Sequence, residues 1–112
     1  MDYRKVTAIV RAVMLEFIER KLVSMNISGI SVTQVSGYGE YHNFYKSDMM
    51  CTHARIEIFC HADQAEKIAH CIMNVAHIGE PGDGIVAILP VEQLYRIRTK
   101  EPEKDHGRKH HE

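Results

Sequence analysis

Long hydrophobic runs and an excess of positive charge are both missing from this sequence. No stretch approaches the roughly 20 consecutive apolar residues that a membrane-spanning helix needs, so no membrane insertion is expected. Arg11 divides the apolar stretch near the start, which argues against a signal peptide. The formal net charge of −1 gives no overall basic field, so composition does not favour nucleic acid or an anionic membrane as a partner.

Cysteine is also scarce. The three that occur form no CxxC pair and leave one over in any disulfide pairing: Cys51, Cys60 and Cys71. The simplest interpretation is reduced thiols in a cytoplasmic protein. No Ser/His/Asp or Cys/His arrangement and no carboxylate pair stands out, so we do not expect an enzyme. The 112 residues, 45% hydrophobic and 26% charged, are typical of one globular domain.

Alternating apolar and polar residues predict four strands, at residues 3–11, 29–39, 53–60 and 84–90. In the third of these, one face is expected to carry Ile56, Ile58 and Cys60. The opposite face would then carry Arg55, Glu57 and Phe59.

Two segments with helical spacing separate these strands. The first helix is predicted over residues 12–25, with an apolar stripe of Val13, Met14, Phe17, Ile18 and Leu22. Asp63 is expected to cap the second helix, which runs to Ala76. Its buried stripe would be Ala65, Ile68, Ala69, Ile72, Met73 and Ala76.

The element order is therefore β-α-β twice, which favours an α+β, ferredoxin-like βαββαβ sandwich: a four-stranded antiparallel sheet with two helices on one face. The other face would be uncovered, so we expect an oligomer that buries it. Residues 40–52 lack a period and suggest a functional loop. The folded domain is placed at residues 1–100, and the charged, histidine-containing segment 101–112 is predicted to be a disordered tail.

The stretch "GEPGDGIVAILP" at residues 79–90 places three glycines within six residues. An Asp-Gly pair usually indicates a hairpin turn, but here a predicted helix precedes it. Gly79 is interpreted as the left-handed residue that ends this helix. Gly82 and Gly84 then leave two possibilities: an ordinary tight turn, or a loop whose backbone approaches an anion.

Two further motifs fit an anion site. Gly37-Tyr38-Gly39 ends the second predicted strand, either as a simple strand terminator or as backbone that bends beneath a ligand. Arg96 and Arg98 lie two apart in a predicted strand, so both guanidinium groups would point the same way. They form either a solvated sheet edge or a phosphate-binding pair.

Histidine and sulfur-containing residues gather in the long loop: His42, Met49, Met50, Cys51 and His53. Such ligands suit copper or zinc. No pair has a recognised metal spacing, and adventitious affinity is the simpler interpretation, so no obligatory metal is expected.

Taken together, "VTAIVR", "GISVTQVSGYG", "RIEIF" and "GDGIVAILPVEQLYRIRT" resemble the PII signal-transduction family over about residues 3–100. The resemblance implies a homotrimer of ferredoxin-like subunits that binds adenine nucleotide in clefts between chains. It also implies a flexible T-loop, at about residues 40–53 here, that regulates a partner transporter or enzyme.

Matching the motifs position by position implies a nucleotide site. Its residues would be Ile9, Ser31, Gly37, Tyr38, Gly39, Glu57, Phe59, Gly82, Asp83, Gly84, Arg96 and Arg98. The glycine segments and both arginines would contact phosphates, Ser31 and Glu57 would lie near the adenine, and Ile9 and Phe59 would form apolar walls. T-loop and second-ligand positions would be Glu40, Tyr41, His42, Tyr45 and His53.

Departures from the family pattern modify the expected ligand. The usual "GFGRQ" reads "GYGEY", which replaces an arginine by Glu40 and a glutamine by Tyr41, and Ile85 stands where relatives carry lysine. Less positive charge disfavours a triphosphate. We therefore expect ADP or AMP to bind better than Mg-ATP, and 2-oxoglutarate to bind poorly.

The short loop most resembles divergent members, including the carboxysome-associated branch, which suggests bicarbonate as a second ligand. His42 or His53 would help to bind it. Tyr45 falls near a tyrosine that some relatives uridylylate, but the changed loop disfavours that modification here. The alternative function is a metal-responsive protein of the same superfamily that binds copper or zinc through loop or tail residues; a slow nucleotide hydrolase is least favoured.

Overall fold

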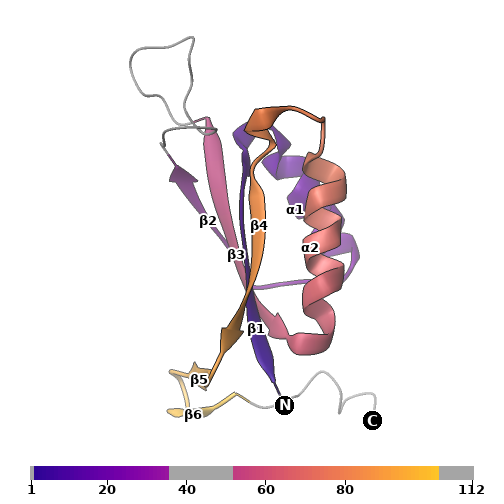
Figure 1. The fold of residues 1–112 in the computed structure, drawn as a ribbon. Coiled ribbons are helices and arrows are strands. Elements are labelled where there is room, and N and C mark those ends of the chain that lie inside the picture. The colour runs from indigo at the N-terminus through magenta and orange to yellow at the C-terminus, as the bar shows by residue number, and fades with distance from the viewer. Residues whose placement is uncertain (1, 36–51, 104–112) are drawn as a thin grey trace.

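The computed structural model describes residues 2–35 and 52–103. A four-stranded sheet in the order β2-β3-β1-β4 forms the centre of the molecule, and all its pairings are antiparallel. The strands are β1 (Tyr3–Arg11), β2 (Ile30–Val35), β3 (His53–His61) and β4 (Ile85–Val91). Helices α1 (Leu15–Ser24) and α2 (Ala62–Ala76) lie on the same side of the sheet (Figure 1). The ferredoxin-like βαββαβ arrangement predicted from the sequence is confirmed.

The strand pairing shows which residues share each face of the sheet. β1 is a central strand, and its Val6 lies opposite Ile58 of β3 and Ile88 of β4. Because side chains alternate along a strand, Val6, Ala8 and Val10 all point toward the helices, where they are buried. On β3, the predicted face that carries Ile56 and Ile58 is the one that points toward the helices and is buried.

The core lies between this inward face and the two helices. Ile18 and Leu22 come from α1, Ile68 and Ile72 come from α2, and all four side chains are fully buried. Burying one such side chain stabilises the fold by about 1.5–3 kcal/mol. The helices are therefore anchored by these residues.

Two members of the predicted first stripe, Val13 and Phe17, are instead 75% and 54% exposed. The segment Ala12–Met14 forms a 3₁₀ turn, and the α-helix begins only at Leu15. A 3₁₀ turn has about three residues per turn, so Val13 does not follow the 3.6-residue phase of Ile18. Phe17 lies beside the buried stripe, and its ring lies 5.9 Å from the Arg20 guanidinium.

The second helix also differs from its prediction in two details. α2 begins at Ala62, with His61 at the N-cap position, so Asp63 lies inside the first turn and is not the cap. Its carboxylate still complements the positive end of the helix dipole. Met73, predicted to lie in the buried stripe, is 42% exposed, because the stripe extends instead toward the side that carries the buried Cys71.

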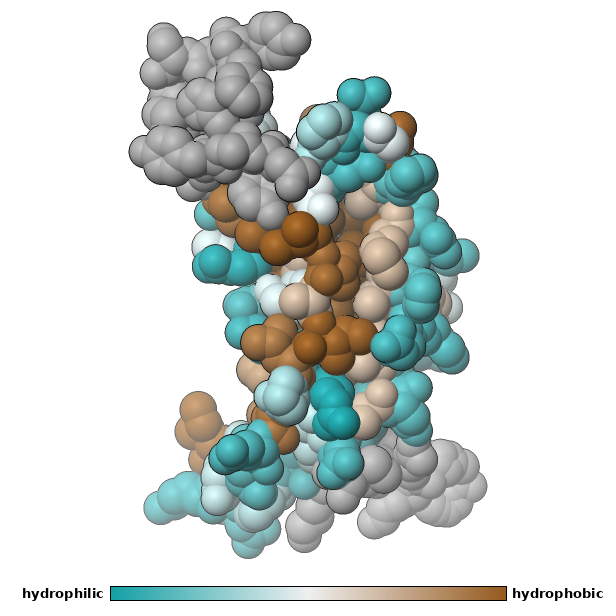
Figure 2. Space-filling view, in the orientation of Figure 1, coloured by the Kyte–Doolittle hydropathy of each residue, from teal (hydrophilic) through white to brown (hydrophobic). Residues whose placement is uncertain are grey.

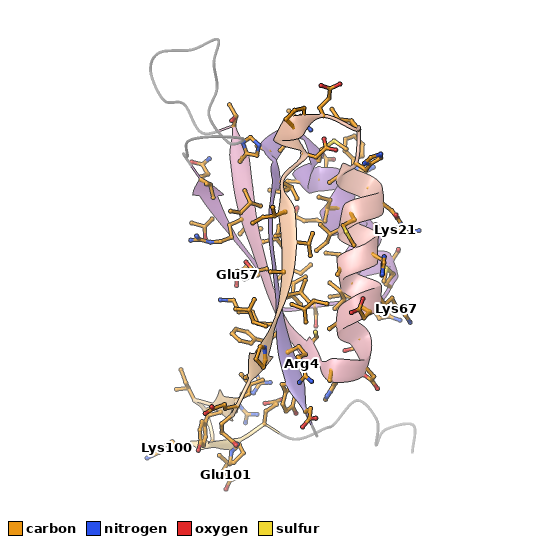
Figure 3. The ribbon with its side chains drawn as sticks, in the orientation of Figure 1. Arg4, Lys21, Glu57, Lys67, Lys100 and Glu101 are labelled. Carbon is orange, nitrogen blue, oxygen red and sulfur yellow. The ribbon has the colours of Figure 1, made fainter. Side chains whose placement is uncertain are left out.

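The face of the sheet opposite the helices is open in the single chain. Phe59, Ile85 and Leu89 on this face are 51%, 51% and 40% exposed. Figure 2 shows hydrophobic side chains gathered over β4. Glu57 also lies on this side of the sheet, away from Lys21 and Lys67 on the helices (Figure 3), and it forms a 2.7 Å ion pair with Lys5. We call this surface the open face.

The chain leaves β4 to form a separate two-stranded sheet of β5 (Tyr95–Arg96) and β6 (Glu101–Pro102). The predicted strand through Arg98 is therefore wrong. The strand ends at Arg96, whose carbonyl accepts hydrogen bonds from the amides of Thr99 and Lys100 in the following turn. The tail predicted to begin at residue 101 is ordered as far as residue 103, because β6 pairs with β5. The rest of the predicted tail lies outside the described residues.

Candidate functional site

The loop between α2 and β4, residues 77–84, is built around Asp83. Pro81–Asp83 form a 3₁₀ turn that leads into β4, so this segment is not a hairpin. The helix ends at Ala76, three residues before Gly79, so Gly79 is not the helix-ending residue, although its φ of +88° is positive as predicted. We call residues 77–84 the GDG loop.

Both oxygens of the Asp83 carboxylate have partners within the chain. Oδ1 accepts a hydrogen bond from the Arg11 guanidinium, and Oδ2 accepts the amides of Ile78 at 3.0 Å and Gly79 at 2.9 Å. The Arg11 hydrogen bond, assisted by these two amides, lowers the pKa of Asp83 to about 2. Asp83 therefore shapes the loop from inside, as a carboxylate that stays ionised.

Two glycines of the GDG loop lie close to β1, and one of them, Gly84, is required there. A Cβ atom on Gly84 would lie 1.8 Å from the carbonyl oxygen of Ile9, and φ and ψ there are 106° and −162°. That conformation is essentially restricted to glycine. A Cβ on Gly82 would lie 2.8 Å from the Arg11 guanidinium. Both glycines thus allow β1 to approach the loop, whether or not a ligand binds there.

His53 connects the GDG loop to the segment that follows the long loop. It was predicted both as the last residue of the T-loop and as the first residue of the third strand; it is the first residue of β3 and only 6% exposed. Its Nε2 lies 3.0 Å from the Gly82 carbonyl and its Nδ1 lies 3.0 Å from Thr52 Oγ1. A neutral ring that donates from Nε2 and accepts at Nδ1 satisfies both contacts. The role in binding bicarbonate that was predicted for His53 conflicts with this buried, hydrogen-bonded position.

Thr52 is held from a second side, because its carbonyl accepts the amide of Ala12 at 2.8 Å. The end of β1, the start of β3 and the GDG loop are therefore joined by direct hydrogen bonds. Sequence reasoning missed this connection, since Arg11, His53 and Asp83 lie far apart along the chain.

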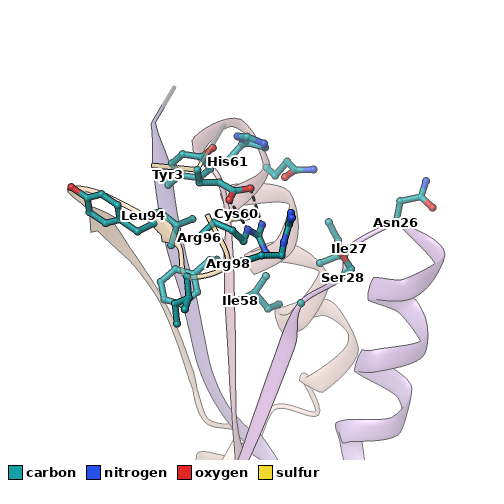
Figure 4. A pocket seen from close by; sticks show the side chains of 16 residues that line it. Tyr3, Asn26, Ile27, Ser28, Ile58, Cys60, His61, Leu94, Arg96 and Arg98 are labelled. Carbon is teal, nitrogen blue, oxygen red and sulfur yellow. Dashed lines mark hydrogen bonds and ion pairs between the residues drawn. The ribbon is translucent and has the colours of Figure 1, made fainter. Parts of the chain in front are cut away.

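The two predicted arginines line a pocket of about 660 Å³ at the other end of the molecule (Figure 4). Arg96 already has a counter-charge within the chain. Its Nε and Nη2 donate to the two oxygens of Glu103 at 3.0 and 2.9 Å. This pair raises the pKa of Arg96. Glu103 was not predicted as a site residue, and the only signal was an acidic residue seven positions after Arg96.

Four predicted adenine-site residues lie together on the open face. In the strand pairing, Ser31 lies opposite Glu57, Ile9 lies opposite Ile85, and Phe59 lies opposite Lys5. The Lys5 hydrogen bond lowers the pKa of Glu57. The remaining predicted positions, Gly37, Tyr38, Gly39, Glu40, Tyr41, His42 and Tyr45, lie outside the described residues.

The GDG loop and the arginine pocket are at opposite ends of β4 (Figure 1). Seven residues of antiparallel strand span about 20 Å. The two predicted phosphate-binding groups are therefore not brought together within one chain.

Two kinds of feature are absent from the described part of the chain. Within residues 2–35 and 52–103, no group of three or more histidine, cysteine or acidic side chains is placed to hold a metal ion. In those same ranges, no helix has the length and apolar character to cross a membrane.

Comparison with known proteins identifies the family. Residues 3–101 match the family model described as nitrogen regulatory protein P-II. The P-II protein of Pyropia yezoensis is 33% identical over 105 residues, which cover 88% of this chain and 94% of the relative. The P-II homologue of Arabidopsis thaliana is also 33% identical, over 88% of this chain, but this chain spans only about half of that relative, 55%.

A solved structure agrees with this assignment. The crystal structure of Arabidopsis thaliana PII bound to citrate superposes with a TM-score of 0.75 at 32% identity, covering 92% of this chain and 90% of that one. Sequence and fold lead to the same conclusion: this chain belongs to the nitrogen regulatory protein P-II family of regulatory signalling proteins.

Proposed function

We propose that the protein is a cytoplasmic homotrimeric regulator that binds ADP or AMP between subunits and signals to a transporter or enzyme through its long loop. The observation that carries this proposal is the separation of the GDG loop from the arginine pocket by the length of β4. A ligand that needs both groups requires one from each of two chains. Nucleotide binding and assembly are then parts of one site.

The open face supplies a surface for that assembly. Phe59, Ile85 and Leu89 are each at least 40% exposed on a sheet face that no helix covers. Burial of such apolar area drives subunit association. The predicted adenine-site residues lie on the same face, so association of subunits would enclose them.

The charges of the GDG loop support a preference for ADP or AMP over Mg-ATP. Arg11 brings a positive charge to the loop, but the Asp83 carboxylate already offsets it. Ile85 follows the loop as an exposed apolar residue where relatives carry a cation. Each added phosphate increases the negative charge that the site must neutralise. The third phosphate would therefore add little favourable binding free energy at this site.

Signalling would follow from the contacts at the end of the long loop. Thr52 and His53 are hydrogen-bonded to β1 and to the GDG loop, so a ligand that moves or orders the GDG loop also acts on the end of the loop that a partner contacts. Bicarbonate remains part of the proposal as a second ligand, with His42 in place of the buried His53 as its candidate histidine.

Titration calorimetry with AMP, ADP and ATP tests the proposal, each with and without bicarbonate or 2-oxoglutarate. ADP or AMP should bind more tightly than Mg-ATP, and 2-oxoglutarate should add little. An absence of adenylate binding at millimolar ligand would rule out the central claim. Sedimentation velocity on the same samples should show a trimer.

The arginine pocket offers a second, independent check. Replacing Arg96 and Arg98 together by alanine should weaken ADP binding strongly while changing adenosine binding little, because adenosine carries no phosphate. Equal losses for the two ligands would contradict a phosphate role for this pair.

A further inference from the structure

Arg96 binds a carboxylate of its own chain with the same guanidinium edge that would bind an anionic ligand. Both Glu103 oxygens contact the Nε and Nη2 edge of the guanidinium, at 3.0 and 2.9 Å. This two-point contact is the geometry by which arginine recognises carboxylate and phosphate groups. Dashed lines mark these contacts beside Arg98 in Figure 4.

Glu103 is placed there by the backbone as well as by its charge. Its amide donates to the Leu94 carbonyl at 2.6 Å, directly after β6. Its side chain is 17% exposed, whereas that of Arg96 is 58% exposed. The carboxylate is therefore enclosed against a guanidinium that still faces solvent and the pocket.

A phosphate that approaches Arg96 finds the Nε and Nη2 edge of the guanidinium already occupied by this carboxylate. The two anions repel each other, and they compete for the same edge of the guanidinium. The segment that carries Glu103 is a two-stranded sheet with two residues in each strand, and so small a sheet is only marginally stable by itself. Withdrawal of Glu103 therefore requires only a local rearrangement.

We propose that Glu103 is an internal competitor of the anionic ligand, which holds Arg96 before the nucleotide binds and releases it when phosphate arrives. This inference rests on the proposed nucleotide function. It adds a regulatory property: the affinity of the site is modulated by a carboxylate in the segment after the "YRIRT" motif, outside the part of the chain that sequence reasoning included in the domain.

Glu103→Gln removes the charge and keeps the size of the side chain. Dissociation constants for ADP and adenosine would be measured by calorimetry for the wild-type protein, E103Q and the control E101Q. Glu101 is exposed in β6, shortly before Glu103, and its backbone pairs with that of Arg96, so E101Q makes the same charge change nearby. Circular dichroism would confirm that all three proteins are folded.

E103Q should tighten ADP binding about two- to fivefold, the range by which partly exposed ion pairs shift an equilibrium. Adenosine binding should not change, and E101Q should leave both ligands unchanged. If Glu103 instead shapes the site for the ligand, E103Q will weaken ADP binding, which overturns the inference; equal affinity for wild type and E103Q overturns it as well. In those two cases the proposed function still stands. If none of the three proteins binds ADP, both the inference about Glu103 and the proposed function are overturned.

Discussion

Replacing Gly84 by alanine should strongly destabilise the subunit even when no ligand is present. The added Cβ would lie 1.8 Å from the Ile9 carbonyl oxygen, far inside van der Waals contact. The backbone at φ 106° and ψ −162° is also unfavourable for any residue with a Cβ. β1 or the GDG loop must therefore move.

The expected cost has two parts. Overpacking of a tight contact costs about 1–3 kcal/mol, and forcing a non-glycine residue into this conformation costs about 1–3 kcal/mol. We expect a loss of about 2–6 kcal/mol in the free energy of unfolding. Gly79→Ala is the matched control, because its φ is also positive, at +88°, while no described atom lies within 4 Å of its added Cβ. That variant should lose only about 1–2 kcal/mol.

Urea unfolding followed by circular dichroism, with all proteins at one subunit concentration, would measure the difference. The reasoning fails if G84A is no less stable than G79A. In that case the glycine is not required by β1, and its presence in the motif would have to be explained by a ligand.

Two further variants test the hydrogen bonds of the GDG loop. The pKa of Asp83 is about 2 in the folded chain, below its ordinary value near 3.9, so its stabilising effect is complete above pH 4 and is lost as the pH falls toward 2. Asp83→Asn should therefore flatten the decline in stability between about pH 4 and pH 2 in acid unfolding experiments; a decline as steep as that of the wild type would contradict this assignment. His53→Ala should cost about 1–3 kcal/mol in urea unfolding, because the Gly82 carbonyl loses its imidazole partner, and a loss below about 0.5 kcal/mol would show that the contact is unimportant.

The strands and the order of the elements could be predicted because alternation is a local property of the sequence. In β3, Ile56 and Ile58 share one face and Glu57 lies on the other, as the pattern predicted, but the pattern left open which face meets the helices. The helices were located correctly, but the margins of their buried stripes were not. Whether Phe17 or Met73 is covered depends on the width of the neighbouring helix and sheet, which no single segment encodes.

The candidate site was predictable as a set of residue types but not as a set of contacts. The glycines and arginines were identified from their spacing and from the resemblance to the family. Their partners were not, because Arg11 is separated from Asp83 by 72 positions and contacts it only after the sheet forms. The ion pair between Arg96 and Glu103 was missed for a different reason: polar composition after residue 100 suggested disorder, whereas β6 and Glu103 are held there against β5 by backbone pairing and charge.

The way the GDG loop is built affects how such a protein can evolve. Asp83 and Gly84 serve the folding of the subunit itself, so substitutions at these positions are selected against even in a lineage that has lost its ligand. Position 85 is constrained differently, because its side chain is half exposed on the open face, which the proposed assembly would cover. Under the proposed function, a lineage could change its preferred nucleotide by exchanging a residue beside the loop while the motif stays intact, so persistence of that motif would be weak evidence that the ligand has been retained.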